Sequence, residues 1–413
     1  MEDDKEKELC NQVNTIERAL GECMIETATA VLRAWLNELG ENNPYEEALQ
    51  SIRNRYQELF TLWLNIDEPN AEEEVDRLTG DMYQLADAVY ADIRLKRGLS
   101  PEMHGFNSDS PQSIINYFQN CIRLQPADFE WVRSVLADEK QASAALLAIS
   151  ALAKNMRECF SIDAFTVMIE GINASNEMVA DFCAHNVLTL LIHYDVRIDF
   201  FPQIQEAFLN AISDTEDMGD HLFEILCSMV SMVKENWLSD YAQGLAPISW
   251  LPEPLQKLVK SVGISSLDYK TFSEWVPKEE EEYMSELVTN LPNTWLYEVL
   301  VNGTPGREEA LAAVGVQSGF RNYMWALPEV AEQVYRDKLR KGSAEPIDYI
   351  NYAHCLLLRG DRMMAFENYK QARQECGSLR AFYDLFRPDR KALVEHGVPL
   401  DCVYAIEDNL VNG

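Results

Sequence analysis

The sequence predicts an all-α fold, with an antiparallel helix bundle followed by a superhelical array of helix pairs. Apolar residues recur at i, i+3, i+4 and i+7 along most of the 413 residues, which is the spacing of helices with one buried face. Residues that cap helices, such as Ser, Asp and Asn, stand before many of these stretches. No stretch shows sustained alternation of β-branched and polar residues, so no sheet is predicted.

Residues 1–98 predict an N-terminal three-helix bundle. The first helix would run to Gly40, and Pro44 stands where the second would have its first helical residue. The third would carry Glu72–Glu74 in its first turn, where the helix dipole favours acidic residues, and would end at Gly98. Short connections between long helices indicate antiparallel neighbours. The apolar spacing of the first helix also fits the seam of a homodimer through this segment.

Residues 99–310 predict an acidic array of shorter helices. Residues 99–110 combine Pro, Gly, Ser and Asn without periodicity, which is typical of a linker. The predicted helices 162–172 and 179–192 form a pair that resembles the helical hairpin of HEAT repeats. Residues 244–306 are more irregular, because prolines and tryptophans interrupt the periodicity.

Residues 311–413 form the third predicted segment, which is organised around two short helices between Pro346 and Ala372. The helices meet at Gly360, which can adopt the left-handed conformation that ends a helix, and Asp361 can cap the next one. Small and aromatic residues recur at helical spacing on the facing sides of the two helices: Tyr349, Tyr352, Ala353, Ala365, Tyr369 and Ala372. Further short helices, expected at 379–386, 390–396 and 400–410, would cover the end of the array.

This pattern resembles a tetratricopeptide repeat, with one good repeat at 346–376. Ala331 and Tyr335 stand 34 residues before Ala365 and Tyr369, which is the period of that family and indicates half of a preceding repeat. The first helix of the preceding repeat matches poorly, since glycines occupy two of its positions.

The resemblance implies that a protein or peptide binds on the concave face of the array. It would place five residues on that face: Ile347, Ile350, Asn351, His354 and Leu358. Members of the family that grip a terminal carboxylate carry Lys, Arg and Asn there. Only Asn351 fits, so a clamp for such a tail is not expected.

The charge is strongly acidic and unevenly distributed. The whole chain has 35 basic and 68 acidic residues, a net charge of −33, and residues 311–413 contribute only −1 of it, from 13 basic and 14 acidic residues. A surface this negative repels phosphate backbones, so no nucleic-acid partner is predicted. It would attract a basic protein, although solubility alone also explains such a surface.

The cysteines lead to a prediction about the compartment, and the hydropathy leads to one about membrane spans. The nine cysteines are scattered without a CxxC pair, as expected of reduced thiols in the cytoplasm. The acidic N-terminus does not resemble a secretory signal, and no run of 18 apolar residues occurs, so no membrane span is predicted.

No recognised catalytic or cofactor motif is present in the sequence. The best metal candidate groups Cys183, His185, His193 and Asp195, but residues two apart on a helix point in different directions and His193 is about 12 Å further along the axis. No metal or cofactor is therefore predicted.

Three further stretches were weighed as sites. The acidic run Glu279–Glu282 is read as a solvated helix start, and the turn Gly303–Arg307 as a capping loop rather than a phosphate site. Glu253 and Glu274, each near a tryptophan, could serve as the paired carboxylates of a carbohydrate-active enzyme built as a helical toroid.

The sequence thus predicts a non-enzymatic helical scaffold that holds a protein or peptide partner. The alternatives are the helical-toroid enzyme that uses Glu253 and Glu274, and a structural protein that self-associates through residues 1–98. The prediction depends on the architecture, because a fold alone does not fix a function.

Overall fold

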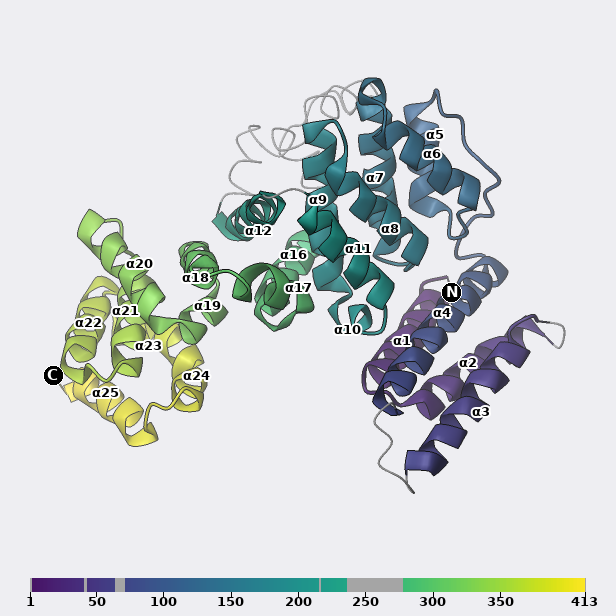
Figure 1. Cartoon of the computed structure of the whole chain (residues 1–413). Helices are drawn as coiled ribbons and strands as arrows, with labels where there is room; N and C mark the ends of the chain where they lie inside the picture. Colours follow the sequence, from purple (N-terminus) through teal and green to yellow (C-terminus); the bar gives the residue numbers. More distant parts are fainter. Residues whose placement is uncertain (1, 41–42, 64–70, 215–216, 236–277, 413) are drawn as a thin grey trace. The chain divides into compact units, whose positions relative to one another are not determined.

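The computed structural model describes residues 2–40, 43–63, 71–214, 217–235 and 278–412, and the fold is all-α, as predicted (Figure 1). No strand occurs in these ranges. The chain divides into two compact units. Among the described residues, unit 1 contains those up to Ile225 together with 293–296, and unit 2 contains the remainder, 226–235, 278–292 and 297–412. The predicted division at 98 and 310 stays a prediction, although the first boundary falls inside unit 1.

Unit 1 begins with four helices rather than the three predicted. They are α1 (Glu2–Gly21), α2 (Ile25–Leu39), α3 (Glu46–Trp63) and α4 (Ala71–Arg97). The helix predicted to reach Gly40 breaks at Cys23, which has φ 54° and is the only non-glycine residue with positive φ in the described ranges. The amide of Met24 turns back to the carbonyl of Ala19 at 2.7 Å and closes the first helix. The third predicted helix is confirmed as α4, with its three glutamates in the first turn.

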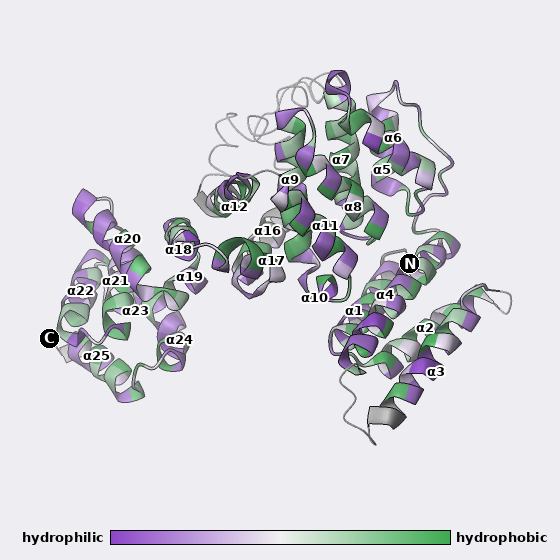
Figure 2. Ribbon diagram, viewed as in Figure 1, coloured by the Kyte–Doolittle hydropathy of each residue, from purple (hydrophilic) through white to green (hydrophobic). Residues whose placement is uncertain are grey.

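The remaining helices of unit 1 are shorter and pack on one another through apolar faces. They are α5 (Pro111–Asn120), α6 (Pro126–Leu136), α7 (Ala142–Met156), α8 (Ile162–Glu170), α9 (Glu177–His193), α10 (Asp195–Ile198) and α11 (Pro202–Ser213). α7 packs on α5 and α9, and α8 packs on α9. Figure 2 shows hydrophobic and hydrophilic residues alternating around these helices, as one-sided burial requires. α12 (Met218–Glu235) begins in this unit.

The predicted linker 99–110 has almost no regular structure, yet it is held firmly against unit 1. The ring of Phe106 lies 4.7 Å from that of Trp131 and 5.0 Å from that of Tyr117, between centroids. The amide of Asn107 donates to the hydroxyl of Ser113 at 2.8 Å. The segment therefore connects two parts of one compact unit, which its composition alone did not indicate.

Unit 2 contains the repeat-like helices. Its helices are α16 (Lys278–Asn290), α18 (Arg307–Gln317), α19 (Arg321–Ala326), α20 (Pro328–Lys341), α21 (Pro346–Leu358), α22 (Arg362–Glu375), α23 (Leu379–Phe386), α24 (Arg390–Glu395) and α25 (Leu400–Asn412). The short helix α17 (Trp295–Tyr297) and a π-helical turn, 298–302, precede α18. The three short helices expected at the end of the chain are confirmed as α23, α24 and α25.

The turn between α21 and α22 has the predicted chemistry. Gly360 has φ 87°, in the left-handed region. The carboxylate of Asp361 accepts a hydrogen bond from the amide of Met364 at 3.1 Å and so caps α22. Ala353, Ala365 and two further predicted packing residues, Ala372 and Tyr369, are fully buried. The small residues thus lie where α21 and α22 pack together.

Gly315 has a packing role that the sequence did not suggest. It lies inside α18, and a side chain there would meet the ring of Tyr323 at 2.5 Å. The glycine was read as a poor fit to a repeat helix, whereas the structure uses it to let α19 approach α18 closely.

Candidate functional site

The five residues predicted to face a partner do not form an open face. Ile350 and His354 are 0% exposed and Asn351 is 6% exposed, while Ile347 and Leu358 are half-buried. The prediction that Ile350, Asn351 and His354 are available to a partner is wrong for this structure. α21 packs against α20, α22 and α23, so most of its circumference is covered.

His354 belongs instead to a buried polar network in the core of unit 2. Its Nδ1 lies 2.6 Å from the hydroxyl of Tyr369 and its Nε2 lies 3.3 Å from the carboxylate of Asp389. Asp389 is also paired with Arg321. Burial lowers the pKa of His354, against the opposing effect of Asp389, so the imidazole is neutral. A neutral ring can accept from Tyr369 and donate to Asp389, which satisfies every partner.

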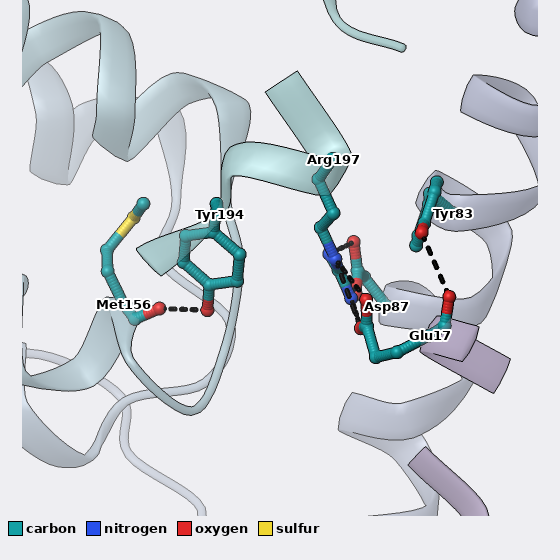
Figure 3. Close-up of polar contacts among 6 residues, drawn as sticks. All are labelled: Glu17, Tyr83, Asp87, Met156, Tyr194 and Arg197. Carbon is teal, nitrogen blue, oxygen red and sulfur yellow. Dashed lines mark hydrogen bonds and ion pairs between the residues drawn. The ribbon is translucent and has the colours of Figure 1, made fainter. Parts of the chain in front are cut away.

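The most elaborate charged cluster in unit 1 is the Arg197 clasp, which we define as Arg197 of α10 with Glu17 of α1 and Asp87 of α4 (Figure 3). Arg197 is 6% exposed. Its Nη1 donates to both oxygens of Asp87 at 3.0 and 3.1 Å, and its Nε donates to Glu17 at 3.1 Å. One guanidinium thus holds two carboxylates from different helices, in the bidentate geometry that arginine favours.

Aromatic rings surround the same guanidinium. Its carbon lies 4.7 Å from the ring centroid of Tyr83, 4.9 Å from that of Phe160 and 5.4 Å from that of Tyr194. The hydroxyl of Tyr194 in turn donates to the carbonyl of Met156, as Figure 3 shows. The cation is therefore held by rings as well as by carboxylates.

Two glycines allow the α10 segment to approach the N-terminal helices. A side chain at Gly80 of α4 would meet the backbone carbonyl of Phe200 at 2.7 Å, and one at Gly21 would meet Val196 at 2.7 Å. These close approaches bring Arg197 within reach of its carboxylates. The α10 segment thus fixes residues 1–98 to the helices that follow them.

A cavity of about 280 Å³ lies beside the clasp in unit 1. Asp87 contributes to its wall, so the clasp and the cavity share one residue. The other walls come from α4, from residues 121–124, from Phe129 of α6, from the end of α7 and from residues 159–164. Both Cys121 and Cys159 line it, and burial raises the pKa of the Cys159 thiol to about 12, so that thiol is protonated.

The clasp has an expected pH dependence. Burial raises the pKa of Asp87 to about 6 from an ordinary value of 3.8, and repulsion by Glu17 adds to this, while Arg197 opposes it. The folded protein therefore binds the proton of the Asp87 carboxyl group more tightly than the unfolded chain does. The contribution of Asp87 to the free energy of unfolding should therefore be greatest below pH 3.8 and decline as pH rises through 6.

This contribution to the free energy of unfolding is at most about 3 kcal/mol, because each unit by which the pKa of Asp87 differs between the folded and unfolded states corresponds to about 1.4 kcal/mol. The measurement is urea unfolding of the native protein and of Asp87→Asn between pH 7 and pH 4. The stability of the native protein relative to the variant should increase as the pH falls. A relative decrease would mean that Arg197 dominates and that the pKa of Asp87 is depressed.

Of the residues considered as a metal site, only Cys183 belongs to the core of unit 1, while His185, His193 and Asp195 are half-buried. Cys183 is fully buried against Gly171, and a side chain at that glycine would meet its sulfur at 2.5 Å. Burial lowers the pKa of His185 and that of His193 to about 4. Asp195 accepts a hydrogen bond from the amide of Trp295 at 2.7 Å. In the part of the chain that is described, no three His, Cys, Asp or Glu side chains are grouped to hold a metal ion.

Of the other stretches considered as sites, the acidic run and the glycine-rich turn lie within the described residues. The acidic run 279–282 lies at the start of α16. In the turn before α18, Gly306 has φ 85°, and Arg307 donates to the carbonyl of Leu300 at 2.7 Å. Glu253 and Glu274 lie outside the described residues.

Arg197, Asp87 and Glu17 were not singled out from the sequence. They are 70 and 110 residues apart along the chain, and no spacing rule links them. The available sign was Arg197 among the apolar residues of the stretch 196–201, which also contains Asp199; a cation buried in such a setting needs a carboxylate partner.

No helix within the described ranges is long and apolar enough to span a lipid bilayer. Comparison of the chain with protein-family models, with curated proteins and with solved structures found no match.

Proposed function

We propose that this chain is a non-enzymatic helical scaffold that holds a protein or peptide partner through unit 2. The observation that carries the proposal is the packing of consecutive helices: α20 packs on α21, α21 on α22 and α22 on α23. Stacked helix pairs of this kind, in which each packs chiefly on its neighbours in sequence, are typical of tetratricopeptide-like arrays that bind other proteins.

The proposed contact is the apolar start of α22. Met363 is 83% exposed and is the most exposed large hydrophobic residue in the described ranges, and its neighbour Met364 is 50% exposed. Leu358, one of the predicted contact residues, is half-buried at the end of α21 just before this turn. Methionine side chains are flexible and polarisable, so they adapt to a partner's apolar surface.

The proposed partner presents an apolar helix or peptide with basic residues beside it. The apolar residues would cover Met363 and Met364, while the net charge of −33 attracts a basic protein from a distance. The proposed compartment is the cytoplasm, which agrees with nine free cysteines.

Self-association through the first helix is less well supported. Its apolar stripe, Leu9, Ile16 and Leu20, is at most 2% exposed, and α1 packs on α2 and α4 of the same chain. A dimer seam on this stripe would require the N-terminal helices to separate first.

The proposal predicts that Met363→Glu with Met364→Glu weakens binding of the partner by tenfold or more. The full chain is used to recover interacting proteins, and a purified basic candidate is then titrated by calorimetry. Buried apolar contacts at the centre of an interface are worth about 1 kcal/mol or more each, and the new carboxylates would have to be desolvated.

A matched control places the same charge on unit 1. Leu209 of α11 is 45% exposed, so Leu209→Glu should leave the affinity unchanged within about twofold. Equal loss of binding in both variants, or in neither, would contradict the assignment of the contact to α22.

A further inference from the structure

The cavity beside the Arg197 clasp has an apolar interior. Ala88, Leu124, Phe129, Leu152 and Phe160 are among its wall residues, and they come from five separate parts of unit 1. A volume of about 280 Å³ is close to the lower limit of small-molecule sites, so only a compact ligand fits.

Most of the polar groups in the wall are already bonded to the protein. The hydroxyl of Tyr90 accepts from Arg94 at 2.8 Å, and the amide of Asn155 donates to the carbonyls of Phe118 and Cys121 at 2.9 and 2.8 Å. These groups keep the wall rigid and offer little to a ligand.

The charged side chains of the wall differ in whether they already have a partner within the protein. Asp87 is occupied by Arg197, and Arg123 is paired with Asp92 and donates to the hydroxyl of Tyr45 at 2.9 Å. The side chain of Asp163 makes no hydrogen bond or ion pair with any described residue. It lines the cavity and is exposed to solvent, so its carboxylate lies at the mouth.

We propose that this cavity binds a small amphipathic amine, with the apolar body between Phe129, Leu152 and Phe160 and the ammonium group at Asp163. An apolar interior favours a hydrocarbon body, and a free carboxylate at the mouth favours a cation there. An anionic ligand is disfavoured, because the one guanidinium in the wall is already paired and two carboxylates are near.

The chemistry recognised is an alkylammonium group, which a free amine and a lysine side chain of another protein both carry. A lysine side chain ends in the same group on a four-carbon chain, but it brings a backbone that the mouth of the cavity would have to accommodate. The two sources are separated by probes of each kind.

The experiment is calorimetric titration of the full chain at low salt with hexylamine, hexan-1-ol, hexanoate and N-acetyl-lysine methylamide. Hexylamine is expected to bind saturably, hexan-1-ol about threefold to fivefold more weakly, since an exposed ion pair contributes that much, and hexanoate not at all. Binding of the lysine derivative as tight as that of hexylamine would assign the site to a protein side chain, and weaker binding would assign it to a free amine.

Two variants and a control complete the test. Asp163→Asn should reduce the affinity for hexylamine to that for hexan-1-ol, and Ala88→Met should abolish binding of both by filling the cavity. Glu177→Gln removes a charge from the first turn of the next helix, α9, away from the cavity, and should change nothing. The proposal is overturned if the native chain does not bind hexylamine, if Asp163→Asn binds it unchanged, or if Ala88→Met still binds it.

Discussion

Replacing Arg197 with methionine is expected to lower the free energy of unfolding of unit 1 by about 3–5 kcal/mol. The substitution leaves the carboxylates of Glu17 and Asp87 close together without the cation that holds them, and such breaking of a buried pair has that cost. The methionine keeps most of the volume between Tyr83 and Phe160, so the loss reports on charge rather than on packing. Urea unfolding followed by circular dichroism measures the total change. Hydrogen exchange of α4 and α10 peptides locates it.

A surface arginine provides the comparison. Arg133 is paired with Glu130 and Glu170, but its side chain is 38% exposed, so Arg133→Met should cost less than about 1 kcal/mol. Adding Glu17→Gln and Asp87→Asn to Arg197→Met should restore much of the loss, since no buried charge is then left unpaired. Equal costs at positions 197 and 133 would show that the clasp contributes no more than a surface pair.

The clasp also explains why residues 1–98 do not form a separate unit. The composition of residues 99–110 indicated a flexible boundary, yet Phe106 is packed among aromatic rings, and Arg197, which follows that boundary, binds two carboxylates that precede it. Contacts between residues 110 and 180 positions apart leave no periodic trace in the sequence. They could not have been predicted without the fold.

Features determined by neighbouring residues were predicted well. Gly360 and Asp361 end one helix and begin the next through their own backbone and side chain, so their roles could be read directly. The break at Cys23 was not predicted, because glycine is the residue type that marks a left-handed backbone conformation in a sequence. Here a cysteine adopts the strained conformation, and its sequence neighbours give no sign of it.

The predicted binding face failed because helical periodicity assumes one covered side. α21 is covered by α20, α22 and α23, so the side opposite Ala353 is buried as well. Asn351 and His354 were assigned to an open face because the tetratricopeptide resemblance places their positions there. In the structure both lie inside the core. The amide nitrogen of Asn351 donates to the hydroxyl of Tyr335 at 3.1 Å, while its Oδ1 has no hydrogen-bond partner among the described residues. The ring nitrogens of His354 lie against Tyr369 and Asp389.

Replacing Tyr369 with alanine should lower the free energy of unfolding of unit 2 by about 3–5 kcal/mol, the usual cost of removing a buried aromatic ring. The side chain is fully buried, and its ring lies 5.4 Å from that of Phe386 at an interplanar angle of 87°. Guanidinium unfolding followed by near-ultraviolet circular dichroism measures the change. Tyr404 is 48% exposed, so Tyr404→Ala should cost less than about 1 kcal/mol.

Tyr369→Phe keeps the ring and removes the hydroxyl, so it tests whether His354 lies in the core or on an open face. In the core, the substitution leaves Nδ1 of the neutral imidazole without a donor, at a cost of about 1–3 kcal/mol. On an open face, water would replace the hydroxyl and the cost would be close to zero. Because a partner cannot reach buried residues, a large cost for Tyr369→Phe also means that partner binding on unit 2 must use side chains other than His354, with Met363 and Met364 the most accessible apolar ones.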